Sequence, residues 1–149
     1  LFKERKVHKT YHSIVYGNFE DKKKEGIIDE PIIEQNAKVN DKGEKEAKYA
    51  FTSFKVLDEA FGLLSLVELK PKTGRMHQLR IHMAHRGHPI IGDFKYGNNN
   101  EFAELKNAFE IEIPRKLYLH AYTIEIEGKP LIKAEYPEHF KKICKYLNF

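Results

Sequence analysis

Cysteine is nearly absent from this chain, and other features that define protein classes are missing as well. Of its 149 residues only Cys144 is a cysteine, and there is no tryptophan. A single thiol excludes an internal disulfide and a thiolate zinc cluster, and it fits a reducing compartment. No apolar run approaches the roughly 20 residues of a membrane span, and no signal-peptide pattern begins the sequence. We therefore expect a cytoplasmic protein without a membrane segment.

Carboxylates are missing from one long segment. Between Lys70 and His88 the chain carries five Lys or Arg and four His but no Asp or Glu. Residues 1–24 form a second basic segment, with seven basic against three acidic residues. The formal charge of the whole chain is only +4, so the remainder is acidic. Two cationic segments on a more acidic scaffold favour nucleic acid as a partner, with an ordinary solvated surface as the alternative.

Most of the hydrophobic pattern is typical of strands. β-Branched and aromatic runs bounded by Gly, Pro and Asn predict extended segments at 7–16, 27–33, 47–57, 63–69, 117–127 and 131–135. The segment at 63–69 is nearly all apolar, which predicts a central strand. Asn40, Asp41 and Gly43 predict an exposed hairpin loop.

Helices are predicted at 75–86, 101–108 and 138–147. Gly87 is expected to end the first helix, and Thr73 with Gly74 is expected to form its N-cap and an anion site. Strands followed by separate helices predict one α+β domain over residues 1–149. Its sheet would be mixed but mostly antiparallel, with a few flanking helices.

The predicted helix at 75–86 carries Arg80 at the border of its apolar face. A half-buried guanidinium needs a carboxylate or phosphate for its donors, unless it extends to solvent. The histidines suggest a metal site, but the helix has no acidic residue and nearby cations would repel a divalent ion. We expect no metal and favour phosphate or backbone contacts; a histidine-dependent nuclease is a less favoured alternative.

Ordered motifs in the sequence resemble those of the RluA-type RNA pseudouridine synthases. They are KTYHSIVYG at 9–17, LKPKTGRMHQLRIHMAHRGHPIIGDFKYG at 69–97 and LYLHA at 117–121, with Pro137 and Phe140 near the end. The resemblance covers nearly the whole chain. It implies part of a pseudouridine synthase catalytic fold, isomerisation of uridine to pseudouridine in ribosomal or transfer RNA, and no cofactor. The target base would be flipped out of its stack and held against an aromatic ring.

The resemblance also implies roles for single residues. Tyr11 resembles the tyrosine that packs on the flipped base, Leu79 the apolar residue beside it, and Arg80 the basic residue that pairs with the catalytic aspartate. Ordinary core packing is the alternative for Tyr11 and Leu79. We expect RNA to contact the polar side chains of the motifs, namely Lys9, Lys72, Thr73, Arg75, His77, Gln78, His82 and Arg86.

One motif of the family does not occur here. Its nucleophilic aspartate belongs to a His-Arg-Leu-Asp sequence before the KTY segment, and these residues contain none. Asp93 matches a Gly-Asp pair that the resemblance marks as structural or substrate-adjacent. We therefore expect the C-terminal part of a catalytic domain, inactive alone, with a water, an anion or a Glu beside Arg80. An exposed sheet edge would allow dimers, although the oligomeric state stays open. A non-catalytic RNA-binding module is the alternative function.

Overall fold

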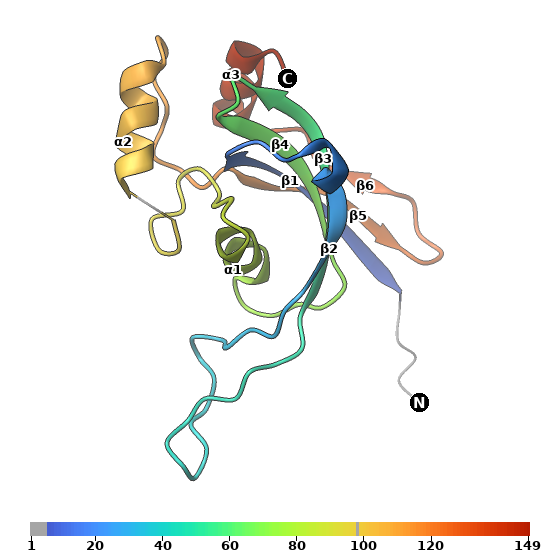
Figure 1. The fold of residues 1–149 in the computed structure, drawn as a ribbon. Coiled ribbons are helices and arrows are strands. Elements are labelled where there is room, and N and C mark those ends of the chain that lie inside the picture. The colour runs from blue at the N-terminus through green and yellow to red at the C-terminus, as the bar shows by residue number, and fades with distance from the viewer. Residues whose placement is uncertain (1–5, 98) are drawn as a thin grey trace.

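Six antiparallel strands form the framework of the computed structural model, which describes residues 6–97 and 99–149. Their order in the sheet is β2-β3-β4-β1-β5-β6 (Figure 1). The strands are β1 (Val7–Tyr16), β2 (Glu25–Asp29), β3 (Phe51–Ala60), β4 (Leu64–Pro71), β5 (Leu119–Ile126) and β6 (Ile132–Lys133). The helices are the 3-10 turn η1 (Asp21–Lys23), α1 (Gln78–His85), α2 (Asn99–Ala108) and α3 (Glu138–Leu147). This confirms the predicted α+β class.

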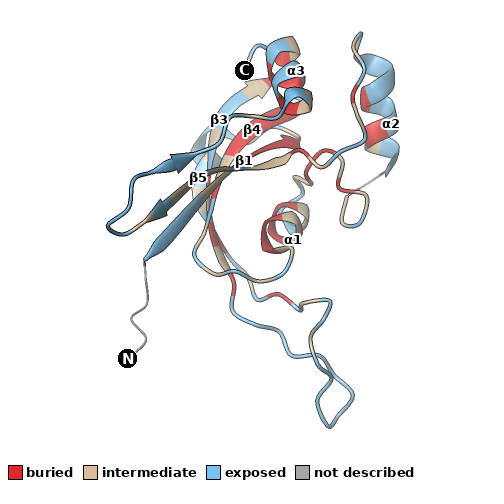
Figure 2. Ribbon diagram, turned by 180° about the vertical axis from the view of Figure 1, so that it is seen from behind, coloured by how far each residue is buried: buried red, intermediate tan, exposed pale blue. Residues whose placement is uncertain are grey.

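The centre of the sheet is the pair of β4 and β1. Leu66 lies opposite Ile14 and Leu69 lies opposite Tyr11, and most of β4 is buried. A strand buried on both faces is mostly apolar, and the sequence of β4 has this character. The prediction that this segment is a central strand is confirmed, and Figure 2 shows the buried residues gathered there.

Helices α1 and α3 lie on opposite faces of the sheet. Successive side chains of a strand point to opposite faces, and Tyr11 and His12 of β1 show the two directions. Tyr11 shares a cleft with Leu79 of α1. His12 bonds to the Tyr136 hydroxyl, and the Tyr136 ring packs 4.5 Å from that of Phe140 in α3. Helix α3 spans the residues predicted for it.

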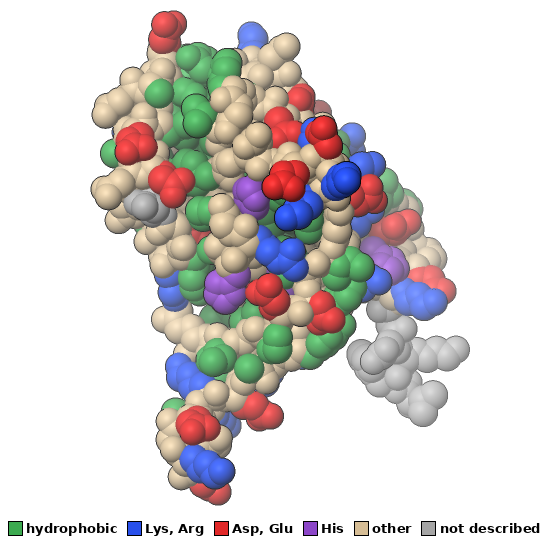
Figure 3. Space-filling view, viewed as in Figure 1, with side chains coloured by type: hydrophobic (Ala, Val, Ile, Leu, Met, Phe, Trp, Pro, Cys, Tyr) green, Lys and Arg blue, Asp and Glu red, His purple; other side chains and the backbone are tan. Residues whose placement is uncertain are grey.

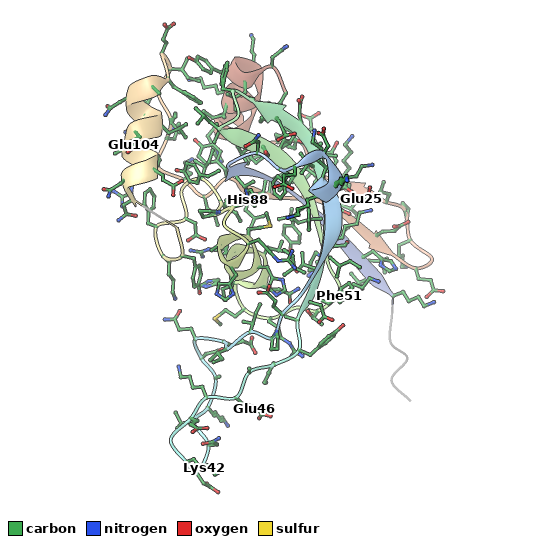
Figure 4. The ribbon with its side chains drawn as sticks, viewed as in Figure 1. Glu25, Lys42, Glu46, Phe51, His88 and Glu104 are labelled. Carbon is green, nitrogen blue, oxygen red and sulfur yellow. The ribbon has the colours of Figure 1, made fainter. Side chains whose placement is uncertain are left out.

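A long hairpin between β2 and β3 projects from the body of the molecule (Figures 1 and 4). Lys42 and Glu46 lie toward its tip, and Phe51 lies where it rejoins the sheet. The Asn40 carboxamide oxygen accepts hydrogen bonds from the backbone N–H groups of Lys42 and Glu44, which closes the turn. The exposed hairpin loop predicted here is therefore confirmed, although it begins inside the segment expected to be strand.

The predicted start of the first helix is wrong. α1 begins at Gln78 rather than at residue 75, because the preceding residue, His77, has φ of 56°. A left-handed residue cannot continue a right-handed helix. Thr73 is therefore not the N-cap: its hydroxyl bonds to the Gln78 side chain and accepts from the Phe51 N–H. No helix in the described part of the chain is long and apolar enough to cross a membrane.

Of the glycines, Gly92 has the least room for a side chain, and this gives a first prediction. Its φ is +83°, and a Cβ added there would lie 1.7 Å from the Lys116 carbonyl oxygen. Gly92→Ala should lower the free energy of unfolding by about 3 kcal/mol or more, measured by urea denaturation. Gly128→Ala is the matched control, because Gly128 also has positive φ but no atom near its Cβ position. It should cost about 1 kcal/mol. Equal losses would contradict the account of this contact.

Candidate active site

A cleft of about 680 Å³ opens where β1, the loop after β4 and the start of α1 meet. It brings together all three predicted catalytic residues, Tyr11, Leu79 and Arg80. Six of the eight predicted RNA contacts also line it, namely Lys9, Lys72, Thr73, Arg75, His77 and Gln78. Among the described residues no carboxylate lines this cleft. Motifs about 60 residues apart thus supply one basic, partly apolar hollow.

Strand β1 supplies the aromatic wall of the cleft. Lys9 and Tyr11 point to the same side because they are two residues apart. Tyr11 is half-buried and packs against the hydrophobic core. The register between β1 and β5 shifts between Thr10 and Tyr11. Such irregularities often lie beside functional sites, where they redirect a side chain.

The loop after β4, which lines the cleft with residues 71–75, is held by Gln78. The Gln78 amide nitrogen donates to the Phe51 carbonyl at 3.0 Å and to the Thr52 hydroxyl at 2.9 Å. Its amide oxygen accepts from the Thr73 hydroxyl at 2.6 Å and from the Arg75 backbone N–H at 3.1 Å. Gln78 is 3% exposed, so its hydrogen-bonding capacity is used inside the protein.

His82 extends this buried network one turn along α1. It is fully buried, and its Nδ1 lies 2.8 Å from the Thr52 hydroxyl. Its Nε2 lies 2.9 Å from the Glu30 carbonyl oxygen, which can only accept, so Nε2 carries the proton. Burial lowers the pKa of His82, and the hydrogen bond to the Glu30 carbonyl only partly opposes this shift. The lowered pKa favours the neutral ring. His82 therefore supports α1 and does not reach a surface where RNA could contact it, contrary to expectation.

The side of the cleft at the start of α1 is strained. His77 holds a left-handed conformation that non-glycine residues rarely adopt, and such positions concentrate at functional sites. Its Nδ1 lies 2.8 Å from the Tyr96 hydroxyl. Burial lowers the pKa of His77, and the charges of Arg80 and Lys95 lower it further, so a neutral imidazole faces the cleft.

Arg80 has a different partner from the one predicted. Its Nε donates to Asp93 Oδ2 at 3.1 Å and its Nη2 donates to Asp93 Oδ1 at 2.9 Å. Where a Glu was among the expected partners, the carboxylate beside Arg80 is that of Asp93. The expected partial burial is confirmed, because the Arg80 side chain is 20% exposed. Asp93 also accepts from the backbone N–H groups of Lys95 and Tyr96.

Asp93 is a partner of Arg80 and not an exposed acid. Its side chain is fully buried and does not line the cleft. Burial alone would raise the pKa of Asp93, but hydrogen bonds from Arg80 and from the Tyr96 and Lys95 N–H groups outweigh it and lower the pKa. The carboxylate is thus ionised and has four donors, which leaves it unsuited to attack a substrate in the cleft.

The basic segments do not form one surface. Arg86 lies outside the cleft, where it pairs with Glu30 and donates to the Ile27 carbonyl. Lys70 pairs with Glu68. In the first segment, Lys24 pairs with Glu59, and residues 1–5 lie outside the described part of the chain. Figure 3 shows acidic and basic side chains interspersed over the visible face.

The histidines of the second segment are dispersed. His88 donates through Nδ1 to the Tyr16 carbonyl, and its ring stacks on Phe19 at 3.8 Å. His85 lies 3.6 Å from Glu30. Over residues 6–97 and 99–149 no three His, Cys, Asp or Glu side chains gather as metal ligands would.

Comparison with known proteins agrees with the motifs that line the cleft. A family model described as RNA pseudouridylate synthase matches residues 1–85, more than half of the chain. The chain belongs to the RluA-type RNA pseudouridine synthases. Its relatives include tRNA pseudouridine synthase C of Vibrio parahaemolyticus, 40% identical over 134 residues that make up 81% of this chain and 52% of that protein. Ribosomal large subunit pseudouridine synthase D of Borreliella burgdorferi is 38% identical over 93% of this chain and 41% of that protein.

Solved structures of this synthase family have the same fold. Human RNA Pseudouridylate Synthase Domain Containing 4 superposes with a TM-score of 0.74 at 27% identity, covering 95% of this chain and 62% of that one. The chain spans about half the length of the curated relatives it matches. Its fold thus corresponds to a large part of a pseudouridine synthase domain.

Sequence reasoning missed two residues of the site. Asp93 was set aside as a nucleophile but not considered as the partner of Arg80, and Tyr96 was not considered at all. The spacing in the segment GDFKYG held a signal, because an aspartate side chain often accepts the backbone N–H groups that follow it in a turn. The contact of that turn with α1 could not be read from spacing.

His82 gives a prediction about pH. Its pKa is lowered in the folded protein, so below about pH 6.5 the unfolded chain binds a proton that the folded chain does not. Stability is therefore complete above pH 6.5 and falls as the pH drops, by up to about 1.4 kcal/mol per pH unit for this group. Urea denaturation at pH 7.5 and 5.5 should show a smaller difference for His82→Gln than for the natural chain. His8→Gln, at an exposed site, is the control; an unchanged pH dependence in His82→Gln would contradict the prediction.

Proposed function

We propose that this chain forms the cleft in which a uridine of transfer or ribosomal RNA is isomerised to pseudouridine. The observation that carries the proposal is the convergence of Tyr11, Leu79 and Arg80, from separate motifs, on one hollow. The names of the relatives, which include tRNA and ribosomal large subunit pseudouridine synthases, support RNA as the substrate class.

The cleft suits a base that has left its stack. A flipped uracil needs an aromatic or apolar surface on its faces, and Tyr11 and Leu79 provide one. Lys9, Lys72 and Arg75 at the rim would hold the phosphates on either side of the target nucleotide. In the reaction the bond from uracil N1 to the ribose breaks, a bond from C5 forms in its place, and the C5 hydrogen is released as a proton while N1 gains one.

The nucleophilic carboxylate comes from outside these residues in our proposal. No described carboxylate lines the cleft, and the oxygens of Asp93 are occupied by four donors. The aspartate would belong to a His-Arg-Leu-Asp motif upstream of the KTY segment, and Arg80 retains free N–H donors to receive it. The isolated chain would then bind RNA without converting it.

Tritium release tests the proposed function. RNA labelled with tritium at uridine C5 is incubated with this chain and with a version extended upstream to include the aspartate motif. We expect release from the extended protein only, because C5 loses its hydrogen when the new bond forms. Release by the chain alone would contradict a nucleophile upstream. If neither protein releases tritium but both bind RNA, a non-catalytic RNA-binding module would be favoured. The lack of a carboxylate among the described residues that line the cleft would also fit such a module.

The basic rim of the cleft gives a prediction about salt. Lys72→Ala should weaken binding of this chain to RNA several-fold regardless of sequence, because one phosphate contact is lost. The slope of log Kd against log salt concentration should fall in magnitude by about 1. Lys145→Ala, which removes an exposed lysine of α3 outside the cleft, is the control and should leave the slope unchanged. Equal effects of the two variants would rule out the cleft as the main RNA contact.

A further inference from the structure

We infer that Asp93 is a positioning residue for the reaction, fixing the direction in which Arg80 presents its remaining donors to the cleft. The effect on the reaction rests on the proposed function, whereas the contact between Asp93 and Arg80 does not depend on it. Two hydrogen bonds, Nε to Oδ2 at 3.1 Å and Nη2 to Oδ1 at 2.9 Å, join the guanidinium to both oxygens of the carboxylate. A two-bond contact sets an orientation that a single bond would leave free to rotate.

Asp93 is itself held from several sides. Oδ1 accepts from the N–H groups of Lys95 at 3.2 Å and Tyr96 at 3.1 Å. The backbone of the same turn is closed by a bond from the Gly97 N–H to the Asp93 carbonyl at 2.9 Å. The carboxylate is fully buried, so water does not compete for it. The turn therefore presents a fixed acceptor to which the flexible arginine adjusts.

Arg80 keeps donors that Asp93 does not take. A guanidinium has five N–H groups, and Asp93 takes one from Nε and one from Nη2, which leaves both from Nη1 and one from Nη2. The Tyr96 ring lies 5.2 Å from Arg80 Cζ and restricts the guanidinium further. Since Arg80 lines the cleft and is 20% exposed, these donors are available to a carboxylate or phosphate bound there.

Pairing with Asp93 also means that Arg80 contributes hydrogen-bond donors to the cleft but little to the attraction of RNA. Arg80 and Asp93 together carry no net charge, so the pair contributes little long-range attraction for RNA. That attraction comes from Lys9, Lys72 and Arg75. Loss of the Asp93 charge should therefore leave RNA affinity unchanged or slightly higher while it slows conversion of bound RNA. A residue needed only for folding would not separate binding from turnover in this way.

The test uses the extended protein that carries the aspartate motif, with tritium release for kcat and filter binding for Kd. Asp93→Asn should lower kcat at least tenfold and leave Kd within about twofold. Glu59→Gln is the matched control: Glu59 also pairs with a cation, Lys24, and accepts a backbone N–H, from Phe19, but lies outside the cleft. It should change neither quantity. An unchanged kcat in Asp93→Asn would overturn the inference.

A double-mutant cycle with Arg80→Lys shows whether Asp93 acts through Arg80. Lysine lacks the fork that Asp93 holds, so Asp93→Asn should slow the Arg80→Lys protein much less than it slows the natural one. Equal slowing in both backgrounds would overturn the inference in favour of a general structural role. If Asp93→Asn does not fold, Asp93→Glu takes its place. That variant keeps the charge but displaces the carboxylate by one methylene. A lower kcat with an unchanged Kd would again support the inference, and an unchanged kcat would overturn it.

A readout independent of activity separates this inference from the proposed function. Nitrogen-15 spectra should show the Nε–H of Arg80 as a slowly exchanging signal in the natural protein, lost or shifted in Asp93→Asn and retained in Glu59→Gln. Failure of the unmodified extended protein to release tritium would contradict the proposed function, yet this signal would still decide whether Asp93 orients Arg80. A fast-exchanging signal in the natural protein would overturn the inference.

Discussion

The buried hydrogen bonds that tie α1 to β3 determine the rest of the site. Apolar packing of α1 on the sheet is non-directional and would allow the helix to rotate or slide. Gln78 and His82, one turn apart, meet Thr52 of β3 from the same side of the helix. An unsatisfied polar group at a buried position is costly, so only one placement of α1 serves both side chains. That placement puts Leu79 and Arg80 on the cleft.

The cleft and the rest of the surface differ in how their charged side chains are distributed. Across much of the surface, acidic and basic groups are mixed and pair locally, as Lys24 does with Glu59. The described residues that line the cleft include lysine and arginine but no acid. Inside that hollow the charge of Arg80 is balanced by a carboxylate buried behind it. The basic residues at the rim of the cleft can therefore attract a polyanion, while Arg80 offers hydrogen-bond donors in an orientation that Asp93 sets.

The sequence allowed much of the fold to be predicted, because strand and helix periods are local properties. Strand β1 and helix α3 were predicted with the bounds that the structure has, and the apolar β4 was correctly predicted to be central. The start of the first helix was wrong, since nothing in the residue type of His77 indicates its positive φ. Backbone strain of this kind is imposed by tertiary contacts.

The candidate site was predictable in part, for a similar reason. Ordered motifs identified Tyr11, Leu79 and Arg80, and these residues do share a cleft. Gln78 and His82 were expected to contact RNA because they are polar side chains of a family motif, yet both are buried and bond to backbone carbonyls at Phe51 and Glu30. The pairing of Arg80 with Asp93 depends on how a turn packs against a helix. Spacing along the chain carries no information on such a contact.

A crystal structure of the upstream-extended protein bound to a uridine-containing RNA would test the central claim most directly, that this cleft receives the target base. The account predicts a flipped uracil against Tyr11 and beside Leu79, a carboxylate from the upstream motif bonded to Arg80, and Asp93 still paired with Arg80 from behind. RNA bound on another face with the cleft unoccupied, or Arg80 turned away from Asp93 toward solvent, would contradict it.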